Sequence, residues 1–189
     1  MPELTERFEE ALAYASRLHI HQKRKATQVP YISHLLSVAA LVLEDGGDED
    51  EAIAGLLHDA VEDQGGKQTL EEVRQRFGEK VAFIVESCSD AFEVPKPPWR
   101  ERKENYLTHL RSAPPNVRRV ALADKVHNAR SILVSLLKDG NKVWNRFNGG
   151  KEGTLWYYQS LVQVFRETGD DFMTYELERI VAEIKSLIR

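Results

Sequence analysis

Apolar residues recur at helical spacing along most of the chain. Each group falls on one face at 3.6 residues per turn, and no stretch alternates apolar and polar residues at the period of a strand. The clearest groups are Leu4, Phe8, Ala11, Leu12, Ala15 and Leu18; Leu35, Val38, Ala39, Leu41 and Val42; Leu155, Tyr158, Leu161, Val162 and Phe165; and Phe172, Leu177, Ile180, Val181, Ile184 and Leu187. The pattern predicts an all-α fold.

The segment 48–63 combines a helical apolar pattern with a polar end. Its apolar residues are Ile53, Leu56, Leu57, Ala60 and Val61. Asp48 is the expected N-cap, because a short polar side chain there accepts a hydrogen bond from a free backbone N–H. One helix over 48–63 would gather the polar side chains of its C-terminal end on one patch. Those side chains belong to His58, Asp59, Glu62 and Asp63. Acids near a helix C-terminus oppose the macrodipole, so a positive partner is expected.

The segment 116–138 is apolar around much of its circumference, which predicts a buried central helix. Asp124, Asn128 and Ser131 lie at i, i+4 and i+7 and form one polar stripe on it. Polar groups on a buried helix need partners such as a metal or a ligand. Arg119, off this stripe, is expected on a solvated face.

Two imidazoles and two carboxylates are the candidate metal ligands: His34, His58, Asp59 and Asp124. This donor set suits one divalent cation with open coordination positions, and a cation held in that way lowers the pKa of a bound water to about 7. Glu62 and Asp63 would stand beside it as spare carboxylates. The residues therefore indicate a metal-dependent hydrolase.

Composition limits the domain count and the class of ligand. With 189 residues, of which 42% are hydrophobic, we expect a single domain over 1–189, with a motif-bearing core of about 8–138 and C-terminal helices over about 154–189. A net charge of −4 lacks the basic excess of nucleic-acid-binding domains, so a small anionic substrate is favoured. A lone Cys88, no leader and no membrane-spanning stretch predict a cytoplasmic protein without a membrane partner.

Three shorter segments carry further expectations. The proline-rich stretch 91–98 is expected to be a mobile loop that borders the substrate. The basic, glycine-containing connection 145–151 is a candidate phosphate contact, with Arg146 as a candidate cation. Thr69, followed by acids, has the pattern of a capping box that starts a short helix ending at Phe77.

Four motifs occur in order along the chain. They are His19-Ile20-His21-Gln22-Lys23-Arg24-Lys25, Pro30-Tyr31-Ile32-Ser33-His34, His58-Asp59-Ala60-Val61-Glu62-Asp63 and Leu122-Ala123-Asp124-Lys125-Val126-His127-Asn128. The His-Asp pattern resembles the HD phosphohydrolase superfamily, and the four motifs together resemble the hydrolase domain of the RelA/SpoT family, from about Phe8 to Ser131. Because the chain ends after its last helices, without a synthetase domain, it resembles the stand-alone small alarmone hydrolases called Mesh1-like.

The resemblance implies hydrolysis of the 3′-pyrophosphate of (p)ppGpp to GDP or GTP plus pyrophosphate, with one Mn²⁺ per chain. His34, His58, Asp59 and Asp124 would hold the ion, although Zn²⁺ or Fe²⁺ also suits these ligand types. Glu62 and Asp63 would orient and deprotonate the attacking water. The residues expected to contact the nucleotide are Arg24, Lys25, Tyr31, Asn128 and Ser131, with Arg146 as a further phosphate candidate.

Other functions stay open at this stage. The same fold acts on other phosphoesters, such as the 2′-phosphate of NADPH, an adenosine alarmone or a nucleoside monophosphate, and pocket shape decides between them. A non-catalytic nucleotide-binding regulator is a second alternative, although such a protein is expected to lack one of the ligands or acids. Trp156, Tyr157 and Tyr158 offer more aromatic surface than one helix face buries, which leaves room for a homodimer.

Overall fold

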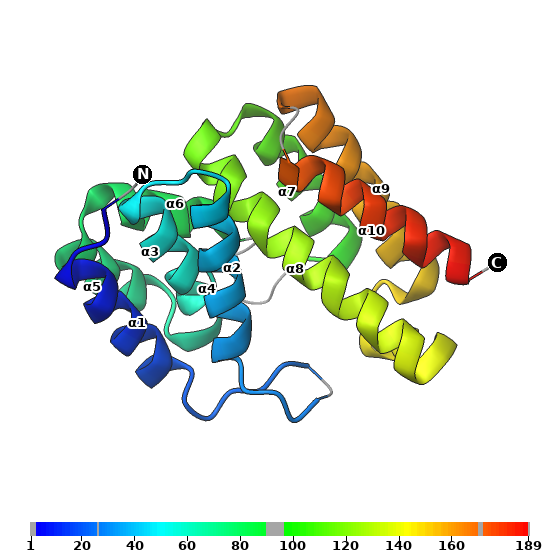
Figure 1. Cartoon of the computed structure of the whole chain (residues 1–189), viewed down its shortest axis with the longest axis horizontal. Coiled ribbons are helices and arrows are strands. Elements are labelled where there is room, and N and C mark those ends of the chain that lie inside the picture. The colour runs from blue at the N-terminus through cyan, green and yellow to red at the C-terminus, as the bar shows by residue number, and fades with distance from the viewer. Residues whose placement is uncertain (1–2, 26, 90–96, 170–171, 189) are drawn as a thin grey trace. The chain divides into compact units, whose positions relative to one another are not determined.

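The protein is all-α, as predicted, in a computed structural model that describes residues 3–25, 27–89, 97–169 and 172–188 (Figure 1). The elements are α1 (Glu6–Leu18), α2 (Ile32–Glu44), α3 (Glu49–Leu57), α4 (Ala60–Gln64), α5 (Lys67–Phe77), α6 (Glu79–Cys88), α7 (Trp99–Ser112), α8 (Pro115–Asp139), the 3-10 helix η1 (Gly140–Arg146), α9 (Gly150–Thr168) and α10 (Phe172–Leu187). Within these ranges no strand forms, and Lys23 and Pro30 make an isolated bridge.

The chain divides into two units. Unit 1 consists of Met1–Lys96 and Pro114–Ala123, and unit 2 consists of Pro97–Ala113 and Asp124–Arg189. Helix α8 begins in unit 1 and continues in unit 2, with the boundary after Ala123. A single domain over 1–189 stays a prediction, and the expectation for 91–98 falls largely outside the described residues.

Helix α3 is the centre of unit 1, where it packs against α1, α2 and α6 (Figure 1). Its apolar residues Ile53, Leu56 and Leu57 are completely buried. The predicted cap at Asp48 is confirmed: its side chain accepts from the backbone N–H of Glu51 at 3.0 Å, and the Glu51 carboxylate accepts from the backbone N–H of Asp48 at 2.8 Å. This reciprocal capping box starts the helix that carries His58 to its position.

The single helix expected over 48–63 is wrong, because the chain breaks at His58 and Asp59. Helix α3 ends at Leu57 and α4 begins at Ala60. The ring of His58 bonds back to the carbonyl oxygen of Gly55 at 2.8 Å, and Asp59 turns the backbone with a ψ of −4°. A side chain that hydrogen-bonds to a backbone carbonyl oxygen competes with the backbone N–H that would continue the helix, so the helix can end there.

The capping box expected at Thr69 is also wrong. Helix α5 starts two residues earlier, at Lys67, after Gly66, which has a φ of 62°. Thr69 lies inside the helix and its hydroxyl donates to the carbonyl of Gln64 at 3.3 Å. The positive φ of Gly66 decides the start, because the left-handed region is open to glycine at little cost.

Arg119 is not on a solvated face, contrary to expectation. In unit 1 its guanidinium bonds to Glu51 at 2.6 Å and to Asp45 at 3.0 Å. Glu51 is 4% exposed and is also the partner of the Asp48 cap, so Arg119 neutralises an acid that α3 needs at its start. A buried carboxylate without such a partner would be strongly destabilising.

In unit 2, α9 packs against α7, α10 and η1. The Trp99 ring at the start of α7 lies against the backbone at the start of α9. A Cβ atom added to Gly149 would come within 2.6 Å of the Trp99 ring, and one at Gly153 within 3.1 Å. The glycine at 149 in the connection 145–151 thus makes room for an aromatic ring.

Candidate functional site

Two histidines and an aspartate meet in unit 1. His34 comes from α2, and His58 and Asp59 form the turn between α3 and α4. One ligand atom from each lies within 4.8 Å of the others. His58 Nε2 is 3.0 Å from Asp59 Oδ2 and His34 Nε2 is 3.5 Å from the same oxygen. We call these residues the His-Asp trio.

The hydrogen bonding of His58 orients its ring as in a metal site. Its Nδ1 faces the carbonyl oxygen of Gly55, which can only accept, so Nδ1 carries the proton. Nε2 is the nitrogen that faces Asp59. Ligating histidines in proteins commonly donate their other ring N–H to a backbone carbonyl in this way. Together with the nearly complete burial of His34 and His58, this donor set fits a divalent cation.

Tyr31 contacts the trio directly. Its hydroxyl donates to Asp59 Oδ2 at 2.6 Å, the same oxygen that the two histidines face. Burial and the charge of Asp59 raise the pKa of the Tyr31 hydroxyl, so it remains a donor. The guanidinium carbon of Arg24 lies 5.4 Å from the centre of the Tyr31 ring. Lys25 is exposed. Contacts of these three residues with a nucleotide stay predictions.

The two acids predicted to act on water lie in the first turn of α4. Because the helix breaks before Ala60, Glu62 and Asp63 follow a helix start and not a helix end. Acids are favourable in a first turn, but α4 has five residues and Asp63 is one residue from its end, so the expected conflict with the macrodipole is reduced and not removed. Glu62 is half-buried and Asp63 is exposed. Asp63 accepts a hydrogen bond from the side-chain amide of Gln22 at 2.7 Å.

The polar stripe of α8 is bonded within unit 2. Asp124 accepts from Lys125 and from Asn128, each at 2.5 Å. Burial would lower the pKa of Lys125, but the charge of Asp124, aided by Tyr106 and Tyr157, raises it well above its ordinary value. The Ser131 hydroxyl donates to the carbonyl of His127 at 2.9 Å. Asp124 as fourth ligand, and Asn128 and Ser131 as nucleotide contacts, stay predictions.

Arg146, the remaining candidate, forms an ion pair with Asp139 in unit 2. Its predicted contact with phosphate would have to compete with this carboxylate. The prediction of a phosphate contact considered only the basic residues of 145–151 and did not take into account Asp139, seven residues before Arg146.

His19 and Gln22 are functional candidates that the sequence left without a role. His19 is 2% exposed and bonds through Nδ1 to Gln22 Oε1 at 2.7 Å. The motif His19–Lys25 contained both residues, but periodicity and residue type did not indicate which carboxylate they would meet. The carboxylate that Gln22 contacts, Asp63, follows it by 41 positions, and His19 reaches that carboxylate only through Gln22.

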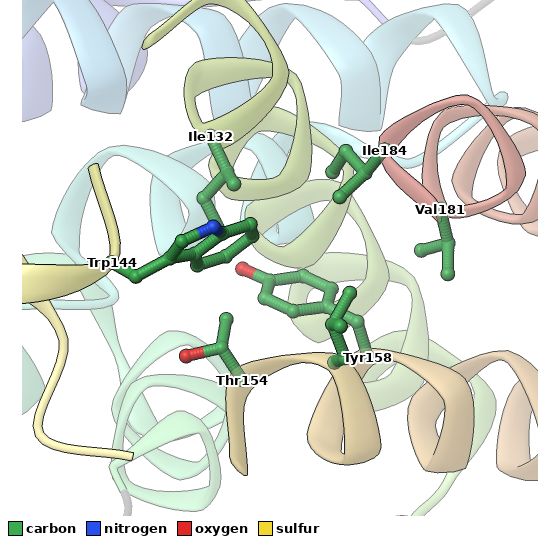
Figure 2. A pocket seen from close by; sticks show the side chains of 7 residues that line it. Ile132, Trp144, Thr154, Tyr158, Val181 and Ile184 are labelled. Carbon is green, nitrogen blue, oxygen red and sulfur yellow. The ribbon is translucent and has the colours of Figure 1, made fainter. Parts of the chain in front are cut away.

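An apolar pocket in unit 2 is too small for a nucleotide. Figure 2 shows side chains from α8, η1, α9 and α10 around it, among them Ile132, Trp144 and Tyr158. Its volume is about 10 Å³, room for a single water at most. It is a packing gap.

None of the helices in the described residues has the length and apolar character needed to cross a membrane.

Comparison with known proteins places the chain in a family. The family model described as HD domain matches residues 11–155. The guanosine-3′,5′-bis(diphosphate) 3′-pyrophosphohydrolase MESH1 of Xenopus tropicalis is 39% identical over 126 residues, which cover 65% of this chain and 68% of that protein. A guanosine-3′,5′-bis(diphosphate) 3′-pyrophosphohydrolase of Aquifex aeolicus (strain VF5) is 38% identical over 136 residues, covering 70% of this chain and 19% of that protein.

A solved structure supports the same assignment at the level of the fold. It is described as a metazoan ortholog of SpoT that hydrolyzes ppGpp, and it matches with a TM-score of 0.80 at 24% identity, covering 97% of this chain and 98% of that one. The resemblance predicted from the four motifs is confirmed. The chain belongs to the HD domain family.

Proposed function

We propose that this chain hydrolyses the 3′-pyrophosphate of guanosine alarmones, converting (p)ppGpp to GDP or GTP and pyrophosphate. The observation that carries the proposal is the His-Asp trio with Glu62 and Asp63 directly after it, in a chain similar to proteins named for this reaction. The substrate is carried over from those relatives.

The proposed ligands are His34, His58, Asp59 and Asp124, and the proposed ion is Mn²⁺, one per chain. A divalent cation bound there would polarise a phosphoryl oxygen and bring the pKa of a water into the physiological range. Removal of the water proton and binding of the nucleotide are then the tasks of side chains of this protein.

Glu62 and Asp63 are the proposed acceptors of the proton from the attacking water. The water oxygen forms a bond to the phosphorus attached to the ribose 3′ oxygen, and the bond between that phosphorus and the 3′ oxygen breaks. The carboxylate takes the water proton, and the 3′ oxygen leaves with the nucleoside and is protonated. A carboxylate placed beside the water supplies general base catalysis, which is typically worth about 10²- to 10⁴-fold in rate.

Cationic and hydrogen-bonding side chains are proposed to hold the nucleotide. Arg24 and Lys25 would meet the phosphates or base, since a planar guanidinium both pairs with phosphate and stacks on rings. Tyr31, Asn128, Ser131 and Arg146 complete the proposed set. Of these, Tyr31 is already bonded to the trio through Asp59, so it would also orient a ligand of the cation.

The direct test is to incubate metal-stripped protein with ppGpp, with and without Mn²⁺, Zn²⁺ or Fe²⁺, and to resolve the products by anion exchange. Asp59→Ala and Glu62→Ala are run beside wild type, with Glu86→Ala, an exposed acid of α6, as the control. The proposal expects GDP and pyrophosphate from wild type and control, dependent on metal and lost in both site variants. Turnover of NADPH or an adenosine alarmone in place of ppGpp would reassign the substrate. If folded, metal-loaded protein turned over none of these substrates, the proposal that the protein is an enzyme would be refuted.

A further inference from the structure

A hydrogen-bonded chain leads from a buried histidine to the exposed carboxylate of Asp63. The side-chain amide of Gln22 lies between them, with its nitrogen 2.7 Å from Asp63 Oδ2 and its oxygen 2.7 Å from His19 Nδ1. Gln64 donates to the same Gln22 oxygen. Because Gln64 and Asp63 are neighbours on α4, Gln22 bonds to that helix at two points.

The positions of the protons along these hydrogen bonds follow from the groups that the bonds join. An ionised carboxylate only accepts hydrogen bonds, so the Gln22 group that faces Asp63 is the NH₂. The Gln22 oxygen can only accept and lies 2.7 Å from His19 Nδ1, so His19 carries its proton on Nδ1 and donates beside Gln64 to the same oxygen. Its other nitrogen, Nε2, is buried and has no hydrogen-bond partner within the described part of the chain. The reverse orientation of the amide would set an oxygen against the carboxylate.

The same histidine supports the other side of the site. The rings of His19 and Tyr31 stack with their centres 5.2 Å apart and their planes at 17°. The Tyr31 hydroxyl in turn bonds to Asp59 at 2.6 Å. His19 therefore contacts the residues that hold two different carboxylates, Asp63 through Gln22 and Asp59 through Tyr31.

We propose that Gln22, seated by His19, is a positioning residue that orients the Asp63 carboxylate for proton transfer from water, an inference that rests on the proposed function. Asp63 is exposed on a five-residue helix, where its side chain would otherwise sample several rotamers. The bond to Gln22 holds Oδ2, so Oδ1 is the oxygen assigned to the water. A base held in one orientation avoids an entropic cost during the reaction.

The first test is Gln22→Leu, which keeps a similar volume and removes the side-chain hydrogen bonds to Asp63, His19 and Gln64. We expect kcat to fall about tenfold, the usual size for a hydrogen bond to a charged group, with KM within about twofold of wild type. The control is Gln68→Leu, an exposed glutamine on α5 of the same unit, which should match wild type. A rise in KM with kcat unchanged would make Gln22 a substrate contact and overturn the proposal.

A double-mutant cycle separates positioning from a general structural effect. If Gln22 acts through Asp63, then Gln22→Leu should change kcat by less than about twofold when Asp63 is already alanine. Additive losses of kcat in the double variant would overturn the proposal, because they would mean that Gln22 contributes independently of Asp63.

A measurement without turnover keeps this inference distinct from the proposed function. In nitrogen-15 NMR of the whole protein, His19 should show a protonated Nδ1 and an unprotonated Nε2, and Gln22→Leu should abolish that preference. The Gln22 amide protons should move upfield in Asp63→Ala. Unchanged signals in these variants would refute the hydrogen-bonded chain even in an active enzyme. If the signals change as expected but the protein does not cleave ppGpp, the proposed function would be refuted. A catalytic role for the hydrogen bonds between His19, Gln22 and Asp63 would be refuted with it.

Discussion

The His-Asp trio of unit 1 and the polar stripe of unit 2 are both sets of buried or half-buried polar side chains, but they are bonded in different ways. The stripe is held together within one helix: Asp124 bonds to Lys125 and Asn128, and Ser131 bonds to the carbonyl one turn before it. The trio combines α2 with the turn after α3, and two imidazole nitrogens face one carboxylate oxygen. A helix can satisfy its own polar groups, whereas the trio is a set of acceptors assembled by packing.

The difference has a chemical consequence. In the stripe the Asp124 carboxylate accepts from two donors, and Lys125 balances its charge. In the trio, the protonated nitrogen of His58 is turned away toward Gly55, and its other nitrogen is directed at a carboxylate. A divalent cation would be a common partner for that arrangement of acceptors.

The largest effect should come from His58→Ala, which removes a member of the trio. We expect metal content to fall below about a tenth of an ion per chain and turnover of ppGpp to fall by about 10³-fold or more. Metal is measured by mass spectrometry on the purified protein. The control is His109→Ala, an exposed histidine of α7. Retention of stoichiometric metal by His58→Ala would contradict the assignment of the trio as ligands.

Asp124→Ala decides whether the stripe joins the metal site. As the proposed fourth ligand, its loss should weaken metal binding by about 100-fold, and the stranded Lys125 should lower the free energy of unfolding by about 3 kcal/mol. Metal affinity is measured by competition with a chelator and stability by urea unfolding. Lys125→Met is the control, since it removes the ion pair and leaves the carboxylate. A loss of stability alone would restrict Asp124 to the ion pair.

Arg119→Ala tests a third kind of buried polar group, one whose charges are already balanced. Removal of the guanidinium leaves Glu51 buried, so the free energy of unfolding should fall by about 2 kcal/mol, less than for a fully buried pair because the Arg119 side chain is 29% exposed. Metal content should stay at the wild-type level. Urea unfolding of this variant beside Arg17→Ala, an exposed arginine of α1, measures the effect. Equal stability of the two variants would show that the ion cluster contributes little.

Tyr31→Phe removes the donor to Asp59 and leaves the ring stacked on His19. We expect metal affinity to fall by about tenfold, the lower end of what partners of metal ligands usually contribute. Tyr14→Phe is a matched control, because the Tyr14 hydroxyl also donates to a carboxylate of unit 1, that of Glu72 at 2.9 Å, away from the trio. Tyr31→Phe with unchanged metal affinity and a raised KM would instead assign Tyr31 to the substrate.

Ser131→Ala should have the smallest effect. The hydroxyl bonds to its own helix, so we expect stability within about 0.5 kcal/mol of wild type. As a proposed nucleotide contact its loss should raise KM about threefold, the size of one neutral hydrogen bond. Ser160→Ala on α9 is the control, since that hydroxyl makes the same bond to the carbonyl four residues earlier. Identical KM values for both variants would leave Ser131 with a purely local role.

Local pattern was sufficient for much of the fold. Apolar periodicity predicted helices close to the observed α1 and α8, and the acid pattern after Asp48 predicted the start of α3. These features depend on side chains within about one turn of each other, so nearby residues contain the information. The Thr69 box failed for the same kind of reason, because Gly66 offered a competing N-cap three residues earlier.

The sequence by itself therefore determined most of the helices, the candidate acids and histidines, and the family to which the chain belongs. Only the tertiary structure decided that the chain breaks at His58, that Arg119 neutralises Glu51, and that Gln22 meets Asp63. The last two contacts join residues 68 and 41 positions apart. The reason is physical. Periodicity indicates which face of a helix is buried, but a bond between distant side chains forms only when packing has placed both segments and has offset the entropy cost of bringing them together.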